Sequence, residues 1–182
     1  MLDAAESVFG ERTYDDASVS EITRRAGVAQ GTFYTHFPDK KAIFLELVRA
    51  LSKGMREATS RAIQGVDDRL DAERRGFRAF FSYIDRHRAV YRLIREAEFV
   101  EPEVYRNHYL HLAEGYRKGL QAAIDAGRLP AGLDAEVAAY CLMGIGDFVG
   151  MRWVLWGDTV PDDVFEQAMR FAVGGLTGGE GA

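Results

Sequence analysis

Residues 18–40 decide the fold, and their sequence is SVSEITRRAGVAQGTFYTHFPDK. Ser18 is a preferred helix N-cap residue, and Glu21 three positions later completes the pattern of a capping box. This pattern predicts a helix over residues 18–26. Gly27 follows as a helix stop, because glycine accepts the left-handed backbone conformation that often ends a helix.

A second short helix is expected directly afterwards, over residues 30–36. It ends before Pro38, which cannot continue a helix. The two helices are amphipathic and are joined by a three-residue turn that contains glycine. Such a pair predicts a helix-turn-helix motif, whose second helix fits the major groove of DNA.

The helical period divides this segment into a buried face and an exposed face. The residues expected in its small core are Val19, Ile22, Ala26, Val28, Phe33 and Phe37, together with Leu2 and Phe9 from a helix over residues 1–11. The residues left facing outward on the second helix are Gln30, Gly31, Thr32, Tyr34 and His36.

Each outward residue has a chemistry suited to DNA. Gln30 can bond to adenine through both of its amide atoms, and Thr32 can touch a base edge or a thymine methyl group. Gly31 lets the backbone come close, while Tyr34 and His36 can bond to phosphate oxygens. These residues are therefore the expected reader of the DNA sequence.

Two further residues stand where helix N-termini attract anions. Lys40 begins the long helix expected over residues 40–64, for which Asp39 is the expected cap, and Ser18 begins the first helix of the motif. We expect both to approach phosphate groups of the DNA backbone.

The segment at residues 18–40 resembles the DNA-binding signature of the tetracycline-repressor (TetR) family, and LDAAESVF at residues 2–9 resembles that family's first helix. The resemblance covers residues 1–48. It departs at Ala29, where a serine usually caps the recognition helix. The resemblance implies a dimeric repressor that binds a palindromic operator in double-stranded DNA and is released by a small-molecule effector. The DNA contacts that it implies are Ser18, Gln30, Gly31, Thr32, Tyr34, His36 and Lys40.

The rest of the chain also has the helical period, with no strand alternation. Further helices are expected over residues 67–85, 89–98, 102–127, 133–156 and 161–175, and their breaks are marked by proline and glycine. The fold class is therefore all-α. The expected domains are a helix-turn-helix domain over residues 1–48, a ligand-binding and dimerisation domain over residues 49–175, and a disordered tail over residues 176–182.

The last two helices are the expected dimer interface. Glycines at 144, 146 and 150 interrupt an apolar helix, and glycines in such a helix usually permit close approach of a neighbour. In TetR proteins the last two helices of each subunit form a four-helix interface, and residues 133–156 and 161–175 match that position. A helix packed only within its own chain is the alternative.

The effector site is expected among aromatic stripes of the second domain. Its candidate residues are Phe81, Tyr105, Tyr109, Cys141, Phe148 and Arg152. An arginine within an apolar helix needs a partner, which could be Glu98, another acid or an anionic ligand. The segment at residues 98–105, with the Tyr- and Gly-rich helices after it, resembles acyl-CoA-responsive TetR members, which implies an acyl-CoA or another aromatic or acyl compound as the effector.

The alternative function is a helical-bundle metal-binding protein or enzyme that uses His108, His111 and Glu114, which share one helix face. The sequence contains no His-Glu-x-x-His motif and no Glu-x-x-His pair, so we expect no enzyme and no cofactor.

The amino-acid composition limits which other classes of protein the chain could belong to. The hydrophobic fraction is 47% and the charged fraction 28%, as in ordinary globular proteins, and a single cysteine excludes an internal disulfide. We expect a cytoplasmic protein with no signal peptide and no membrane partner. The net charge of -5 gives no general attraction to nucleic acid. We therefore expect weak nonspecific DNA binding that depends modestly on salt.

Overall fold

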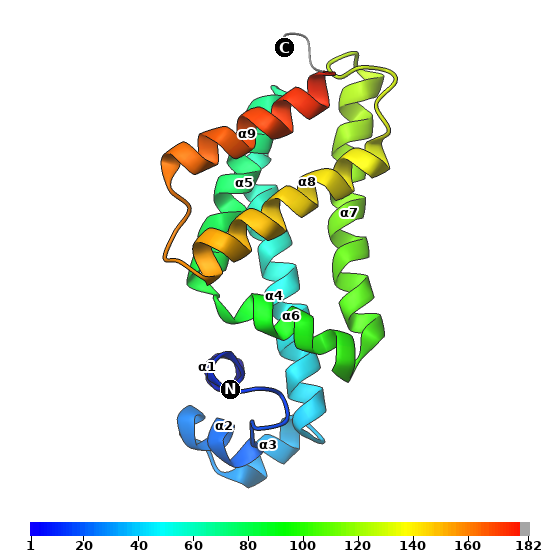
Figure 1. Cartoon of the computed structure of the whole chain (residues 1–182). Coiled ribbons are helices and arrows are strands. Elements are labelled where there is room, and N and C mark those ends of the chain that lie inside the picture. The colour runs from blue at the N-terminus through cyan, green and yellow to red at the C-terminus, as the bar shows by residue number, and fades with distance from the viewer. Residues whose placement is uncertain (179–182) are drawn as a thin grey trace. The chain divides into compact units, whose positions relative to one another are not determined.

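The computed structural model describes residues 1–178, and within them all regular structure is helical (Figure 1). The helices are α1 (Leu2–Glu11), α2 (Val19–Ala26), α3 (Gln30–His36), α4 (Lys40–Ile63), α5 (Arg69–Arg86), α6 (Ala89–Val100), α7 (Pro102–Asp125), α8 (Ala135–Gly150), η1 (Met151–Leu155) and α9 (Asp162–Thr177). The all-α prediction is confirmed, and each expected helix is present within a few residues of its expected bounds.

The predicted helix over residues 133–156 changes its winding near its end. Residues 151–155 form a π-helical turn, in which the Trp156 N–H donates to the Met151 carbonyl at 3.1 Å. Such wide turns occur mostly as single insertions in α-helices. The periodicity of the sequence could not reveal it, because one widened turn barely shifts the apolar pattern.

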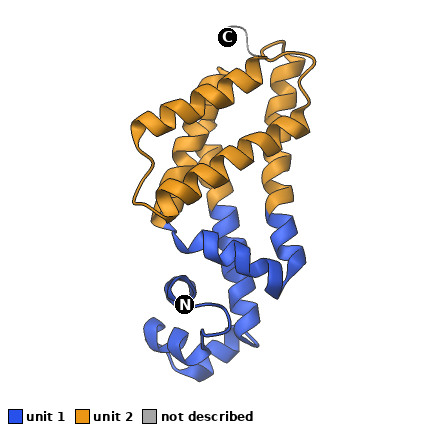
Figure 2. Ribbon diagram, in the orientation of Figure 1, with its two compact units in different colours: residues 1–54, 87–108 blue, residues 55–86, 109–182 orange. Residues whose placement is uncertain are grey.

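The chain folds into two compact units (Figure 2). The first contains residues 1–54 and 87–108, and the second contains residues 55–86 together with the chain from 109 onward. This packing does not follow a single cut at residue 48, because α6 and the first turns of α7 belong to the first unit. The functional division at residue 48 stays a prediction.

The expected tail over residues 176–182 begins later than predicted. Leu176 and Thr177 belong to α9, and Leu176 is buried in the core of the second unit. The helix ends at Gly178, whose φ of 78° is left-handed. The remaining tail residues lie outside the described part of the chain.

The ends of α2 are fixed by its own sequence. Ser18 has extended backbone angles, and its Oγ accepts a hydrogen bond from the Glu21 N–H at 3.2 Å. Gly27 adopts a φ of 68°, and the next residue, Val28, donates its N–H to the Thr23 carbonyl at 3.1 Å. The N-cap and glycine predictions are confirmed, and these two ends set the corner between α2 and α3.

The core of the first unit is aromatic. Phe9 of α1 meets Phe44 of α4 edge-on at 5.2 Å between ring centroids, and Tyr14 meets the same ring at 4.9 Å. Ile22 and Phe33 are fully buried, as the helical period predicted. This core fixes which face of α3 points inward and which points outward.

Helix α6 packs against α1 within the same unit. A Cβ on Gly10 would lie 3.1 Å from the Ala89 Cβ, so glycine permits this close approach. The Glu96 carboxylate accepts the Tyr14 N–H at 3.0 Å, and the His87 ring nitrogen lies 2.9 Å from Glu6. The helix-turn-helix is therefore supported by an element that follows it by more than fifty residues.

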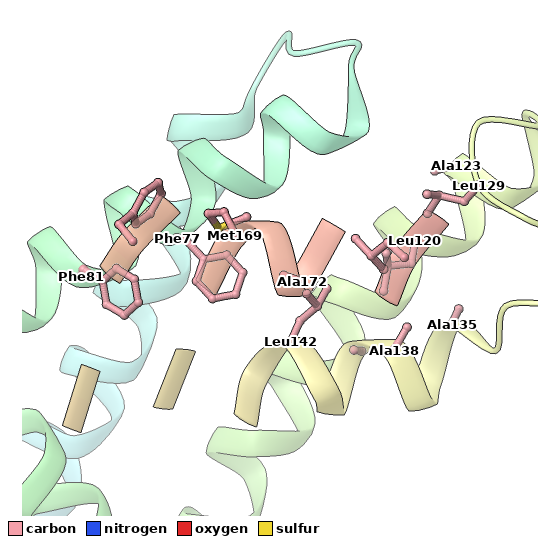
Figure 3. Packing of buried hydrophobic residues seen from close by; sticks show 13 residues of the cluster. Phe77, Phe81, Leu120, Ala123, Leu129, Ala135, Ala138, Leu142, Met169 and Ala172 are labelled. Carbon is pink, nitrogen blue, oxygen red and sulfur yellow. The ribbon is translucent and has the colours of Figure 1, made fainter. Parts of the chain in front are cut away.

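The core of the second unit joins four helices (Figure 3). The buried cluster takes Phe77 and Phe81 from α5, Leu120 from α7, Leu142 from α8 and Met169 from α9. Gly146 lets α8 approach α5, since a Cβ there would contact Phe77 at 3.4 Å. At Gly146 the glycine of α8 therefore permits close approach of a helix of the same chain, α5.

An ion pair is buried in this second unit. Arg69 and Glu73 are one turn apart on α5, and they pair through the Arg69 Nη2. Burial raises the pKa of Glu73 despite this partner, and burial together with the Glu73 charge raises the pKa of the nearby Tyr116. A side chain at Gly119 would overlap the guanidinium, so the glycine makes room for it.

We predict that Ser18→Ala lowers the free energy of unfolding by about 1 kcal/mol, because the Glu21 N–H loses its acceptor. Urea denaturation followed by circular dichroism measures the change. Ser20→Ala is the matched control, because Ser20 is exposed within the same helix and its hydroxyl caps nothing. Equal effects of the two substitutions would contradict the capping role.

Candidate nucleic-acid interface

The outward residues of α3 form one exposed surface. Gln30, Gly31, Thr32, Tyr34 and His36 are all exposed, and the Tyr34 side chain keeps 57% of its surface accessible. The Tyr34 ring meets the buried Phe33 ring edge-on, with 5.2 Å between the ring centroids. This contact supports the Tyr34 ring, which stays exposed to solvent. The structure therefore brings the sequence-predicted reader residues together.

The backbone of α3 is open to an approaching surface. A Cβ on Gly31 would meet nothing within 4 Å, so no neighbouring element of the protein requires glycine at this position. Ala29 precedes the helix and provides no side-chain cap, as its sequence departure from the family indicated. Thr35 differs from Thr32, because its hydroxyl donates to the Thr32 carbonyl at 2.6 Å.

The arginine side chains of α2, near the exposed face of α3, form ion pairs within the protein. Arg24 pairs with Glu21 at 2.7 Å, and Arg25 pairs with both Glu21 and Glu11, the latter at 2.6 Å. These arginines lower the pKa of Glu21 to about 2, with hydrogen bonds from Arg24 as the first cause. The Glu21 carboxylate therefore serves this ion-pair cluster, and it does not complete the capping box that the sequence predicted.

The two lysines at the start of α4 are also engaged. Lys41 pairs with Glu101 at 2.8 Å. The Lys40 ammonium donates to three backbone carbonyls, those of Tyr14, Asp15 and Ala17, at 2.7, 3.2 and 2.9 Å. Sequence reasoning missed these contacts, because the acceptors are main-chain atoms more than twenty positions away.

Helix α4 itself begins as predicted. Asp39 caps it through Oδ1, which accepts the Ala42 N–H at 2.8 Å. With the N-cap at Ser18 this gives two capped helix starts in the first unit.

The predicted effector residues are not gathered at one place in either unit. Phe81 is buried in the second unit's core, against Phe165. Cys141, Phe148 and Arg152 share a stripe as expected, but the stripe is exposed. An exposed guanidinium needs no buried partner, and that of Arg152 lies 5.4 Å from the Trp153 ring centroid.

The two tyrosines of the predicted set are half-buried, and they belong to different units. Tyr105 is in the first unit and Tyr109 in the second. Periodicity placed both on one face of α7, but it could not tell which packing unit each would join.

The residues of the alternative metal site have other roles. The His108 Nδ1 lies 2.7 Å from the Ser52 hydroxyl inside the first unit, and the Glu114 carboxylate pairs with Arg117 at 3.0 Å. Within residues 1–178 no group of three or more His, Cys, Asp or Glu side chains is placed to hold a metal ion. The geometry therefore gives no support to the metal-binding alternative.

The outer face of α8 and α9 is apolar and exposed in this single chain. On α8, Val137, Tyr140 and Phe148 are 61%, 44% and 65% exposed, and Phe171 of α9 is 77% exposed. Trp156, after η1, is also exposed. Large exposed apolar side chains gathered on neighbouring helices often mark an interaction site.

This apolar helix also meets the simplest criteria for a membrane span. Residues 135–155 include an 18-residue window with a hydropathy of 1.2, of which 44% is buried inside the protein. A core helix of a soluble protein meets the same criteria, so the finding is weak evidence for a membrane. Its inner face is accounted for by the core of the second unit.

Comparisons with known proteins agree with this geometry. Residues 1–47 match the family model described as bacterial regulatory proteins, tetR family. The chain is 28% identical over 180 residues to the HTH-type transcriptional regulator YdgC of Bacillus subtilis, covering 97% of this chain and 90% of that protein. It is 29% identical to the HTH-type transcriptional activator FasR of Mycolicibacterium smegmatis, covering 97% of this chain and 81% of that protein.

Solved structures share the fold along nearly the whole chain. The transcriptional regulator FadR from Bacillus subtilis, solved in complex with stearoyl-CoA, superposes with a TM-score of 0.84 at 22% identity, covering 96% of this chain and 97% of that chain. GusR of Salmonella enterica superposes with a TM-score of 0.81 at 21% identity, covering 96% and 92%. The match over residues 1–47 and the relatives along nearly the whole chain show that this protein is similar to HTH-type transcriptional regulators, with a helix-turn-helix domain like that of the TetR family.

Proposed function

We propose that the protein is a ligand-responsive repressor that binds a palindromic operator as a dimer and is released by an acyl-CoA. The observation that carries the DNA-binding part is the exposed face of α3, where Gln30, Thr32, Tyr34 and His36 project from a helix anchored by the buried Phe33. These side chains suit base edges and phosphate oxygens. Repression is proposed because a DNA-bound protein can block transcription by occupancy alone, without a contact to another protein.

Recognition in this proposal depends on hydrogen bonds and shape more than on charge. The arginine and lysine side chains near α3 are bonded to glutamate carboxylates or backbone carbonyl oxygens of the same unit. Few of these positive charges are therefore available to neutralise DNA phosphates. Because the salt dependence of binding follows the number of neutralised phosphates, a shallow salt dependence is expected.

A second copy of the chain is the proposed occupant of the α8–α9 face. The exposed side chains Val137, Phe148 and Phe171 offer apolar surface from both helices. Gly144, Gly174 and Gly175 have open space where a side chain would lie, so another backbone can approach closely there. A twofold dimer is the assembly that reads two half-sites of a palindrome, about 34 Å apart for successive major grooves.

The second unit is the proposed effector domain. Its interior holds aromatic and aliphatic side chains from four helices, including the proposed contact Phe81, and apolar surroundings of this kind suit an acyl chain. The second proposed contact, Tyr109, is half-buried in the same unit. Support for the acyl-CoA class comes from the FadR structure of the same fold, which was solved with stearoyl-CoA. Cys141, Phe148 and Arg152 are reassigned to the dimer face, and Tyr105 stays a predicted contact.

Release requires that the effector prefer a conformation that binds DNA less well. Helix α4 carries residues of both units, since it begins at Lys40 and ends at Ile63. A change at its second-unit end can therefore shift the first unit that carries α3. By linkage, operator DNA weakens effector binding by the same factor as the effector weakens operator binding.

We predict that Tyr34→Ala and Thr32→Ala each weaken operator binding roughly tenfold, because each removes a contact to DNA. The operator is first selected from random duplexes, and dissociation constants are then measured by gel shift. Thr35→Ala is the control on the same helix, because its hydroxyl is already bonded to the Thr32 carbonyl. Wild-type affinity of both Tyr34→Ala and Thr32→Ala would reject α3 as the reader.

We predict that Phe148→Glu combined with Phe171→Glu gives a monomer at micromolar concentration, since charges would be buried in the proposed dimer interface. Sedimentation velocity measures the mass of each species. Phe99→Glu is the control, because Phe99 is 85% exposed and lies on α6, which belongs to the first unit. A dimer that survives the double substitution would place the interface elsewhere.

We predict that long-chain acyl-CoAs release the protein from its operator, with stearoyl-CoA as the first ligand tested. Fluorescence anisotropy of a labelled operator follows the release during titration. Free coenzyme A and the free fatty acid serve as controls for the head group and the chain. Operator binding that persists at saturating acyl-CoA would reject this effector class while leaving the DNA-binding function intact.

A further inference from the structure

The ammonium group of Lys40 is held by the protein's own backbone. A lysine ammonium has three N–H donors and no acceptor. Three carbonyl oxygens lie within hydrogen-bond distance of its Nζ, those of Tyr14, Asp15 and Ala17, and the ammonium also lies 4.5 Å from the centroid of the Tyr14 ring. Its donors are therefore used within the first unit, and none is left for a DNA phosphate.

The three carbonyls belong to one ordered turn between α1 and α2. The Ala17 N–H donates to the Thr13 carbonyl at 3.0 Å, and the Thr13 hydroxyl donates to Asp16 at 2.8 Å. The turn is also held from α6, through the bond from the Tyr14 N–H to Glu96. Lys40 thus binds a turn that is held by its own hydrogen bonds and by Glu96 of α6.

The contact joins the two ends of the helix-turn-helix segment. Ala17 is the residue before the Ser18 cap of α2, and Lys40 is the first residue of α4. Every residue of α2 and α3 lies between these two points, at positions 18–39. A single ammonium therefore fixes both ends of the segment that carries the reader residues.

We propose that Lys40 is a positioning residue for DNA recognition, which acts by clasping the two ends of the helix-turn-helix and not by a hydrogen bond to phosphate. The proposal rests on the DNA-binding function proposed above. The clasp orients α3, so its loss reduces the discrimination between operator and unrelated DNA. A phosphate contact contributes equally to both kinds of DNA, so its loss leaves that ratio unchanged.

The two roles predict opposite results for Lys40→Arg. Arginine keeps the positive charge and binds phosphate with two parallel hydrogen bonds, so a phosphate contact would survive the substitution. Its planar guanidinium cannot direct donors toward three carbonyl oxygens that converge on one point. The clasp would therefore open although the charge is retained.

The experiment compares wild type, Lys40→Arg and Lys40→Met on the selected operator and on an unrelated duplex of equal length. Dissociation constants are measured by fluorescence anisotropy over a series of salt concentrations. Lys41→Arg is the matched control, because the neighbouring lysine pairs with one side chain, that of Glu101. Melting curves by circular dichroism establish that each variant is folded at the temperature of measurement.

We expect both Lys40 variants to lose roughly tenfold or more in operator affinity, the scale of hydrogen bonds to a charged group. Binding to the unrelated duplex and the salt slope should stay near the wild-type values, and Lys41→Arg should behave as wild type. If Lys40→Arg is unfolded, Lys40→Met decides alone, because its ratio of operator affinity to unrelated-duplex affinity falls if Lys40 orients α3 and stays unchanged if Lys40 contacts phosphate.

Two results would overturn the proposal. One is wild-type operator affinity for Lys40→Arg. The other is equal weakening on both duplexes by Lys40→Met, with the salt slope reduced by about 0.9 as one lost phosphate contact requires. Failure of the wild type to select any operator would reject the DNA-binding function itself and the proposal with it. Once an operator is selected, these variants test the clasp alone.

Discussion

The full burial of Phe33 in the core of the first unit is the constraint on which the exposed face of α3 depends. Phe33 is fully buried, and its neighbours on α3 are therefore turned outward as a group. The corner at Gly27 makes this packing reachable, since only a left-handed residue there turns the chain sharply enough to lay α3 beside α2. A helix of seven residues has little stability of its own, so its orientation comes from these tertiary contacts.

The electrostatics of the first unit favour rigidity over attraction to DNA. Arg25 ties α1 to α2 through Glu11 and Glu21, and Lys41 ties α4 to the residue that follows α6. Exposed ion pairs contribute little stability one by one, but a network with several shared partners restricts the relative motion of the helices it joins. A protein with a net charge of -5 gains little from general attraction to DNA, so a well-oriented reader matters more.

The second unit uses its apolar residues in two ways. One face of α8 packs inward with α5, α7 and α9, while the opposite face leaves large side chains such as Phe148 exposed. A helix that is apolar on both faces needs a neighbour on each, and the second copy of the chain proposed above would cover the exposed face. The buried pair of Arg69 and Glu73 adds a polar point to this interior, where burial raises the pKa of the carboxyl group.

The sequence by itself determined the helical fold, the helix bounds within a few residues, and the outward face of α3, because caps, glycine stops and the 3.6-residue period act between near neighbours. Only the tertiary structure decided that Lys40 binds backbone carbonyls, that Arg152 is exposed, and that α6 packs with the helix-turn-helix. The reason is physical: these outcomes depend on which elements meet across long stretches of chain. A local pattern gives the direction of a side chain from its helix axis, but it does not give the atoms that the side chain meets there.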